Sequence, residues 1–125
     1  MATVTVTTDN FEQLVSDNDI VVLDFWASWC GPCKRFAPIF EAASNTHGDV
    51  VFGKVDTEDQ RELAAAFGIQ SIPTTVFYRG QVPIHMQPGL LPAEALEDLL
   101  GQVRALDMEA VKAEMDRRRA DADAT

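Results

Sequence analysis

A stretch of nearly continuous apolar, β-forming residues, Ile20 to Ala27, leads directly into the run Trp29-Cys30-Gly31-Pro32-Cys33. An apolar run of this length is typical of a central strand that is buried on both faces of a sheet. The residues that follow carry an apolar stripe at helical spacing, from Phe36 to Ala43. The sequence therefore places its only two cysteines at the junction between a buried strand and a helix.

The spacing of the two cysteines predicts a redox-active pair. Residues three apart lie on nearly the same face of a first helical turn, so Cys30 and Cys33 are close enough to form a disulfide. Cys30 is expected near the helix N-cap, where free backbone N–H groups and the helix dipole stabilise a thiolate. Cys33 is expected to be less exposed. Cys30 would attack a substrate disulfide and Cys33 would resolve the mixed disulfide, beside a surface that Gly31 and Pro32 leave open.

The size and charge of the chain indicate a single globular domain that does not bind nucleic acid or anionic membranes. The chain of 125 residues is about one domain long, and its 46% apolar and 24% charged residues are typical of a globular protein. Residues Met1 to Thr8 contain neither a basic patch nor an apolar segment of a secretory signal, so we expect a cytoplasmic protein. In a reducing cytosol a lone cysteine pair indicates transient chemistry. The net charge of −10 argues against nucleic acid and anionic membranes as partners.

Strand and helix patterns alternate along the rest of the chain. The pairs Asp9–Glu12 and Thr57–Gln60 predict side-chain caps for two helices, and Leu91 occupies the expected N-cap of the last helix. The order β-α-β-α-β-α-β-β-α predicts an α/β fold, with a central mixed sheet of about five strands flanked by about four helices. The remaining strands are predicted at Ala2 to Thr7, Val50 to Val55, Thr74 to Tyr78 and Gln81 to Met86.

The residues around the cysteines closely resemble the active-site stretch of the thioredoxin family: Phe25-Trp26-Ala27-Ser28-Trp29-Cys30-Gly31-Pro32-Cys33-Lys34. Further matches follow in the right order. Asp24 corresponds to the family's buried aspartate, Lys54 to a lysine near it, Ile72-Pro73-Thr74 to its cis-proline loop, and Gly89 to a glycine that lines the docking surface. The resemblance covers roughly residues 2 to 105 and implies the thioredoxin fold.

The resemblance and the chemistry of these residues together suggest roles for them. Burial raises the pKa of a carboxyl group, so Asp24 is a possible proton shuttle for Cys33, and Lys54 is placed to stabilise its ionised form. Trp29 is expected to belong to an exposed apolar rim around Cys30. The resemblance further implies that Pro73 follows a cis peptide bond and that its loop binds an extended peptide from the substrate protein.

The function implied is that of a thioredoxin, an electron carrier for cell redox homeostasis that reduces disulfides in client proteins. No flavin fingerprint, phosphate-binding loop or other cofactor motif is present, so the electrons must come from another protein or a small thiol. The expected partners are a thioredoxin reductase and disulfide-containing clients, and a monomer is expected. Two alternatives stay open: a disulfide oxidase or isomerase of the same fold, and a binding module that works through its C-terminal segment.

Zinc binding is the competing use of a Cys-x-x-Cys pair. A structural zinc site normally needs four ligands, and only His47 and His85 are available to join the two cysteines. Both histidines lie far along the chain, so no metal site is predicted.

The segment after residue 105 departs from the family pattern. We assign residues 1–105 to a thioredoxin domain and residues 106–125 to a helical extension with a disordered end. Gly101 is expected to separate this extension from the preceding helix, and Arg117 to Arg119 to terminate it. The alternative is that the extension docks onto another chain.

Overall fold

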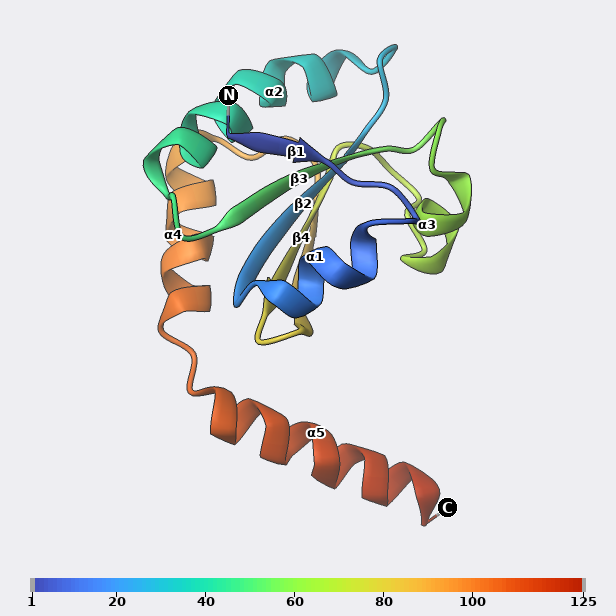
Figure 1. Ribbon diagram of the computed structural model, residues 1–125, viewed down its shortest axis with the longest axis vertical. Helices are drawn as coiled ribbons and strands as arrows, with labels where there is room; N and C mark the ends of the chain where they lie inside the picture. Colours follow the sequence, from blue (N-terminus) through green and yellow to red (C-terminus); the bar gives the residue numbers. More distant parts are fainter. Residues whose placement is uncertain (1, 125) are drawn as a thin grey trace.

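The computed structural model of the chain describes residues 2–124 and contains a five-stranded mixed sheet in the order β1-β3-β2-β4-β5 (Figure 1). Strands β1, β3 and β2 are parallel, whereas β4 runs antiparallel to β2 and β5 antiparallel to β4. The strands span Thr3–Thr5 (β1), Ile20–Trp26 (β2), Val51–Asp56 (β3), Thr74–Arg79 (β4) and Val82–Pro88 (β5). The predicted strand for the apolar run Ile20 to Ala27 is confirmed: β2 lies at the centre and its first six residues are buried.

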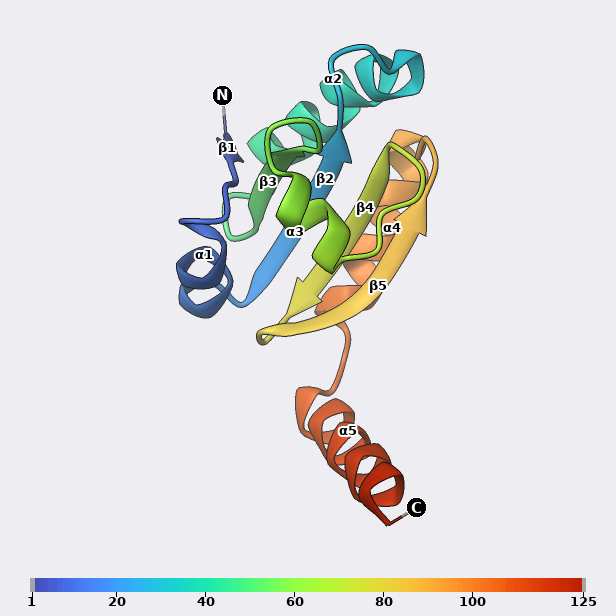
Figure 2. The same ribbon diagram turned by 90° about the vertical axis from the view of Figure 1, so that its right-hand side faces the viewer.

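Helices cover both faces of the sheet (Figure 2). One core cluster joins the sheet to α2 and α4, and its members include Val22, Phe36, Phe40, Phe52 and Leu96. A second cluster joins the opposite face to α1 and α3. The helices span Phe11–Asp17 (α1), Gly31–Thr46 (α2), Arg61–Ala66 (α3), Ala93–Arg104 (α4) and Met108–Asp123 (α5). The predicted element order and fold class are thereby confirmed, with α5 as an additional helix.

The predicted side-chain caps of α1 and α3 are wrong. Asn10 is the N-cap residue of α1, and its Oδ1 accepts the backbone N–H of Thr7 instead of a helical N–H. Gln60 is the N-cap residue of α3 and also gives no side-chain cap, while the Thr57 hydroxyl donates to the carbonyl oxygen of Trp26. The Asn10 side chain thus closes the loop before α1, whereas the Thr57 side chain connects the loop before α3 to the end of β2.

The ends of α4 also differ from the prediction. Pro92, not Leu91, is the N-cap residue, because Leu91 is buried in the core cluster with α2 and α4. Gly101 lies within α4 and does not separate the last two helices. The break comes after Arg104, and Asp107 caps α5 by accepting the backbone N–H groups of Glu109 and Ala110.

The extension forms α5, which projects away from the sheet in both views and buries none of its residues. The arginine run does not terminate this helix. Arg117 and Arg118 instead pair with Glu114 one turn earlier, and Arg119 pairs with Asp116. Within residues 2–124, no helix is long and apolar enough to cross a membrane.

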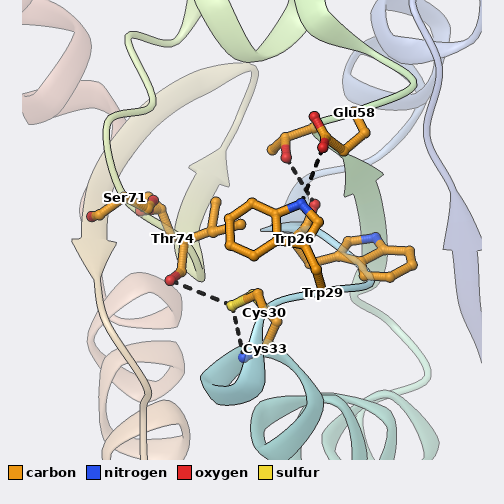
Figure 3. Close-up of a disulfide and its surroundings, with 9 residues drawn as sticks. Trp26, Trp29, Cys30, Cys33, Glu58, Ser71 and Thr74 are labelled. Carbon is orange, nitrogen blue, oxygen red and sulfur yellow. Dashed lines mark hydrogen bonds between the residues drawn. A yellow bond between two sulfur atoms is a disulfide. The ribbon is translucent and has the colours of Figure 1, made fainter.

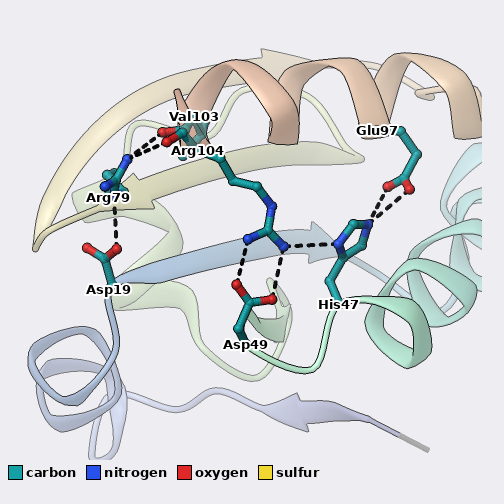
Figure 4. A network of polar contacts seen from close by, with 7 residues as sticks. All are labelled: Asp19, His47, Asp49, Arg79, Glu97, Val103 and Arg104. Atoms are coloured by element: carbon teal, nitrogen blue, oxygen red, sulfur yellow. Dashed lines mark hydrogen bonds and ion pairs between the residues drawn. The ribbon is translucent and has the colours of Figure 1, made fainter. Parts of the chain in front are cut away.

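A polar network ties α2 to α4 at the end of the sheet remote from the cysteines (Figure 4). Arg104 of α4 donates to Asp49 and to His47 Nδ1. His47 Nε2 in turn lies 2.8 Å from the Glu97 carboxylate. The Arg104 guanidinium holds the pKa of Asp49 down at about 2 through the hydrogen bond between them. His47 is therefore part of a bridge between helices.

Candidate active site

Cys30 and Cys33 form a disulfide at the start of α2, with their Cα atoms 5.2 Å apart. Cys30 is the N-cap residue of the helix, and its Sγ accepts the backbone N–H of Cys33 at 3.2 Å. Pro32 lies in the first turn of the helix, where it needs no N–H group. The expected N-cap position of Cys30 is confirmed, and it places the sulfur at the positive end of a 16-residue helix.

The two cysteine residues are almost equally buried in this oxidised state. Cys30 is 4% exposed and Cys33 3%, so the expected difference in exposure between them is absent. The two cysteines form a small buried cluster with Ala27, and the side chains of Trp26 and Ile72 pack against this cluster. The neighbouring Trp29 is 67% exposed, as expected for a residue of the rim.

Trp29 is held in place by a contact that the sequence did not suggest. Its indole N–H donates to Glu58 Oε1 at 3.0 Å (Figure 3). Glu58 lies between β3 and α3, 29 residues away along the chain, and no local motif marks it. A groove extends from this pair across α3 to Ile72, with Arg61 on its wall.

The predicted cis-proline loop lies directly opposite the disulfide. The Ile72–Pro73 peptide bond is cis, and the Ile72 carbonyl oxygen lies 3.7 Å from Cys30 Sγ. The Thr74 hydroxyl closes the loop by donating to the carbonyl oxygen of Ser71 at 2.7 Å. Gly89 joins the same surface, since its N–H donates to the Pro73 carbonyl oxygen at 2.8 Å. Gly89 has φ of 95°, a left-handed conformation that favours glycine.

Asp24 lies on β2, fully buried, with no hydrogen-bond partner in the protein for either carboxylate oxygen. Burial raises the pKa of Asp24 to about 7, and the nearby charge of Lys54 acts in the opposite direction. Lys54 is the directly paired residue on β3, and its Nζ lies 4.7 Å from the centre of the Trp26 ring. The alternation of side chains along β2 puts Asp24, Val22 and Trp26 on the face that α2 covers.

The two histidines lie away from the cysteines in the fold. His47 belongs to the bridge between α2 and α4, and His85 of β5 contacts Gln87. Among residues 2–124, no three metal-ligating side chains gather in one place. The chemistry that the site itself offers is that of two sulfurs, a helix N-terminus and a buried carboxyl group.

Comparisons with known proteins agree with this geometry. The sequence model of the thioredoxin family, described as "Thioredoxin", matches residues 2–102. A putative thioredoxin 2 of Streptomyces coelicolor is 57% identical over 111 residues, covering 89% of this chain and 83% of that protein. A thioredoxin of Alicyclobacillus acidocaldarius is 40% identical and covers 82% of this chain and 98% of its own length.

Solved structures show the same fold. A mutant thioredoxin from Halobacterium salinarum superposes with a TM-score of 0.77 at 30% identity, covering 84% of this chain and 92% of that one. Plasmodium falciparum thioredoxin superposes with a TM-score of 0.74 at 34% identity, covering 80% and 97% of the two chains. The chain therefore belongs to the thioredoxin family, and its Cys30–Cys33 pair carries out dithiol–disulfide exchange.

Proposed function

We propose that Cys30 is the nucleophile and Cys33 the resolving cysteine of a reductase for client disulfides. The supporting observation is the position of Cys30 at the α2 N-cap, where the Cys33 N–H donates to its sulfur. That hydrogen bond and the helix dipole stabilise a thiolate at Cys30. Cys33 is the third residue of the helix, in its first turn.

The reaction transfers two electrons from the reduced pair to the client. The Cys30 thiolate forms a bond to one client sulfur, and the client disulfide breaks, so that the other client sulfur leaves and takes up a proton. Cys33 then loses its proton and forms the bond to Cys30 Sγ. The bond between Cys30 and the client breaks, and the second client sulfur leaves as a thiol after protonation.

Asp24 is the proposed acceptor of the Cys33 proton. It lies on the sheet face that α2 covers, and its pKa of about 7 makes it an effective proton acceptor near neutral pH. Lys54, paired with it across the sheet, favours the ionised form that can accept the proton. A buried carboxyl group with no protein hydrogen bond is otherwise costly.

The client is proposed to bind across the loop formed by Ile72, Pro73 and Thr74. The Ile72 carbonyl oxygen lies beside Cys30 and is available to pair with an extended peptide as a short strand would. Trp29 provides apolar contact on one side and Gly89 lets the chain pass closely on the other. Gly31 and Pro32 add no side chain that would block the approach.

The proposed partners are disulfide-containing clients and a thioredoxin reductase that returns the pair to its dithiol form. We further propose that the protein acts in the cytoplasm as a monomeric electron carrier. The net charge of −10 supports protein partners over nucleic acid or anionic membranes. The domain boundary near residue 105 remains part of this proposal.

Reduction of insulin by dithiothreitol tests the assignment. Wild type should accelerate the reaction, Cys30→Ser should abolish the acceleration, and Cys33→Ser should accumulate a mixed disulfide at Cys30. Equal rates for wild type and Cys30→Ser would contradict the reductase function. Titration of the pair against glutathione separates a reductase from an oxidase, because a reductase pair stays oxidised in buffers that reduce an oxidase pair.

A further inference from the structure

Four buried side-chain polar atoms between residues 2 and 124 lack a hydrogen-bond partner in the protein. They are both carboxylate oxygens of Asp24, Nε1 of Trp26 and the hydroxyl oxygen of Thr75. These three residues are neighbours in the sheet: Thr75 of β4 is the direct antiparallel partner of Asp24, and Trp26 lies two residues along β2. The unpartnered atoms thus gather in one small region.

The Thr75 side chain lies on the same sheet face as Asp24. Directly opposed residues of an antiparallel pair point to the same side, with their Cβ atoms about 4.5–5.5 Å apart. This face is the one covered by α2, the helix that carries Cys33. Thr75 is fully buried there.

Packing alone does not account for threonine at this position. A buried hydroxyl without a partner is unfavourable, and valine would fill nearly the same space and favour a strand equally well. The flanking residues of β4 that point to the opposite face, Thr74 and Val76, do not share this situation: the Thr74 hydroxyl has its own acceptor, the Ser71 carbonyl oxygen. In this conformation the Thr75 hydroxyl has no acceptor, although its strand partner is Asp24, whose carboxylate oxygens have no donor.

We propose that Thr75 is a positioning residue for Asp24, donating its hydroxyl hydrogen to the carboxylate directly, after rotation about χ1, or through one bridging water. The bond favours the ionised carboxylate. The charged group that acts on Asp24 is Lys54 of β3. Helix α2, which carries Cys33, packs over the same sheet face, and β4 places no titratable side chain next to Thr75. Asp56 of β3 lies opposite Trp26, and its Oδ1 accepts the backbone N–H of Glu58.

The inference rests on the proposed role of Asp24 in accepting the Cys33 proton. With the Thr75 hydroxyl in place, a larger fraction of Asp24 is ionised at neutral pH and ready to take that proton as Cys33 Sγ bonds to Cys30 Sγ. Without the hydroxyl, the carboxyl group holds its own proton more tightly, and the resolving step needs a higher pH.

The test compares Thr75→Val and Thr75→Ser by nuclear magnetic resonance titration of the Asp24 carboxyl carbon in the full chain. Loss of a hydrogen bond to a charged group should move the Asp24 midpoint upward by about one pH unit in the valine variant, and serine should restore it. Ser44→Ala is the matched control, because it removes another buried hydroxyl, one bonded to the Glu41 carbonyl oxygen in α2. It should leave the midpoint unchanged.

Stopped-flow measurement of mixed-disulfide resolution gives the second readout. Thr75→Val should slow this step roughly fivefold at pH 7 and move its pH profile upward with the Asp24 midpoint. The same substitution in an Asp24→Asn background should have no effect on the rate. If Thr75→Val does not fold, Thr75→Ala replaces it with the same expectation.

An Asp24 midpoint that stays the same in Thr75→Val, or that moves equally in Thr75→Ser, would overturn the inference. Failure of the proposed role of Asp24 looks different. In that case Asp24→Asn would resolve mixed disulfides as fast as wild type, while the titration would still report whether Thr75 acts on the carboxyl group.

Discussion

Trp29 and Glu58 are joined by a hydrogen bond of 3.0 Å from the indole N–H to the carboxylate, although Trp29 itself is 67% exposed. The bond ties the aromatic residue next to the nucleophile to the segment that leads into α3. An exposed ring would otherwise occupy several rotamers. Glu58 therefore restricts the orientation of the apolar rim that a client meets first.

Glu58→Ala should release the Trp29 ring, whereas Glu58→Gln keeps an oxygen that can accept the indole N–H. We expect a change in Trp29 fluorescence and a loss of up to about 1 kcal/mol in client binding for alanine, because the bond is near the surface. Fluorescence quenching by iodide and the KM for insulin measure the two effects. The interpretation fails if the glutamine and alanine variants behave alike.

Asp24→Asn should stabilise the protein increasingly as pH rises. The pKa of Asp24 is raised from 3.8 to about 7 in the folded state, so the native state holds a proton that the unfolded state has lost. The cost of this burial is absent below pH 4, grows between pH 4 and 7, and then stays constant. We expect a gain of up to about 4 kcal/mol for the variant above pH 7. Urea unfolding of both proteins from pH 4 to 8 measures this difference in the free energy of unfolding. A gain that does not depend on pH would contradict the raised pKa of Asp24.

Gly53→Ala and Gly101→Ala should change stability in opposite directions. A Cβ atom at Gly53 would lie 2.5 Å from Val6 Cγ2 and 3.0 Å from Leu23 Cδ2, both in the core. Such overpacking costs about 1–3 kcal/mol. A Cβ at Gly101 of α4 meets nothing within 4 Å, so alanine should stabilise the helix by about 0.5–1 kcal/mol. Thermal unfolding at one pH compares the stability of both variants with that of wild type. Destabilisation by Gly101→Ala would show that α4 has no free space for a Cβ atom at residue 101.

Removal of residues 108–125 should leave the thioredoxin domain intact. No residue of α5 is fully buried, and its apolar contact with the body is a groove in which Val111 and Met115 are half-buried beside the start of β5. Its deletion therefore exposes only a modest apolar surface. We expect insulin reduction within about twofold of wild type and a change in unfolding free energy of less than about 1 kcal/mol. Asp121→Asn in the full chain controls for the change of charge, because the deleted segment carries five acidic and four basic residues and this substitution likewise removes one negative charge. A large loss of stability on deletion would mean that α5 packs on the body of the protein, and an effect confined to one client would favour a docking role.

Much of the architecture was predictable because it depends on local patterns. The apolar run Ile20 to Ala27 favoured a buried central strand. The position of Cys30 at the start of the following helix could be predicted from the neighbouring residues alone. The chemistry of the Cys-x-x-Cys pair follows from the same few residues. The family resemblance added the cis bond before Pro73, which the structure contains. It also suggested that Gly89 lines the docking surface, and that role stays a prediction.

Other features depended on which of several hydrogen-bond partners a polar side chain takes. The caps of α1 and α3 failed as predictions because Asn10 and Thr57 bond to neighbouring loops and strands instead of their own helices. The break before α5 came from the Asp107 cap, with Gly101 remaining helical. Several partners were within reach of each polar side chain, and residue spacing alone does not say which of them it bonds.

The sequence by itself determined a buried strand, a helix with two cysteines in its first turn, and hence thiol chemistry at a helix N-terminus. Periodicity and short spacings carry that information because strands and helices repeat over a few residues. Only the tertiary structure brought Glu58 to Trp29, Ile72 to Cys30 and Thr75 to Asp24. Those pairs arise from strand register and loop packing, which join residues 29 to 51 positions apart in the sequence, farther than any local pattern reaches.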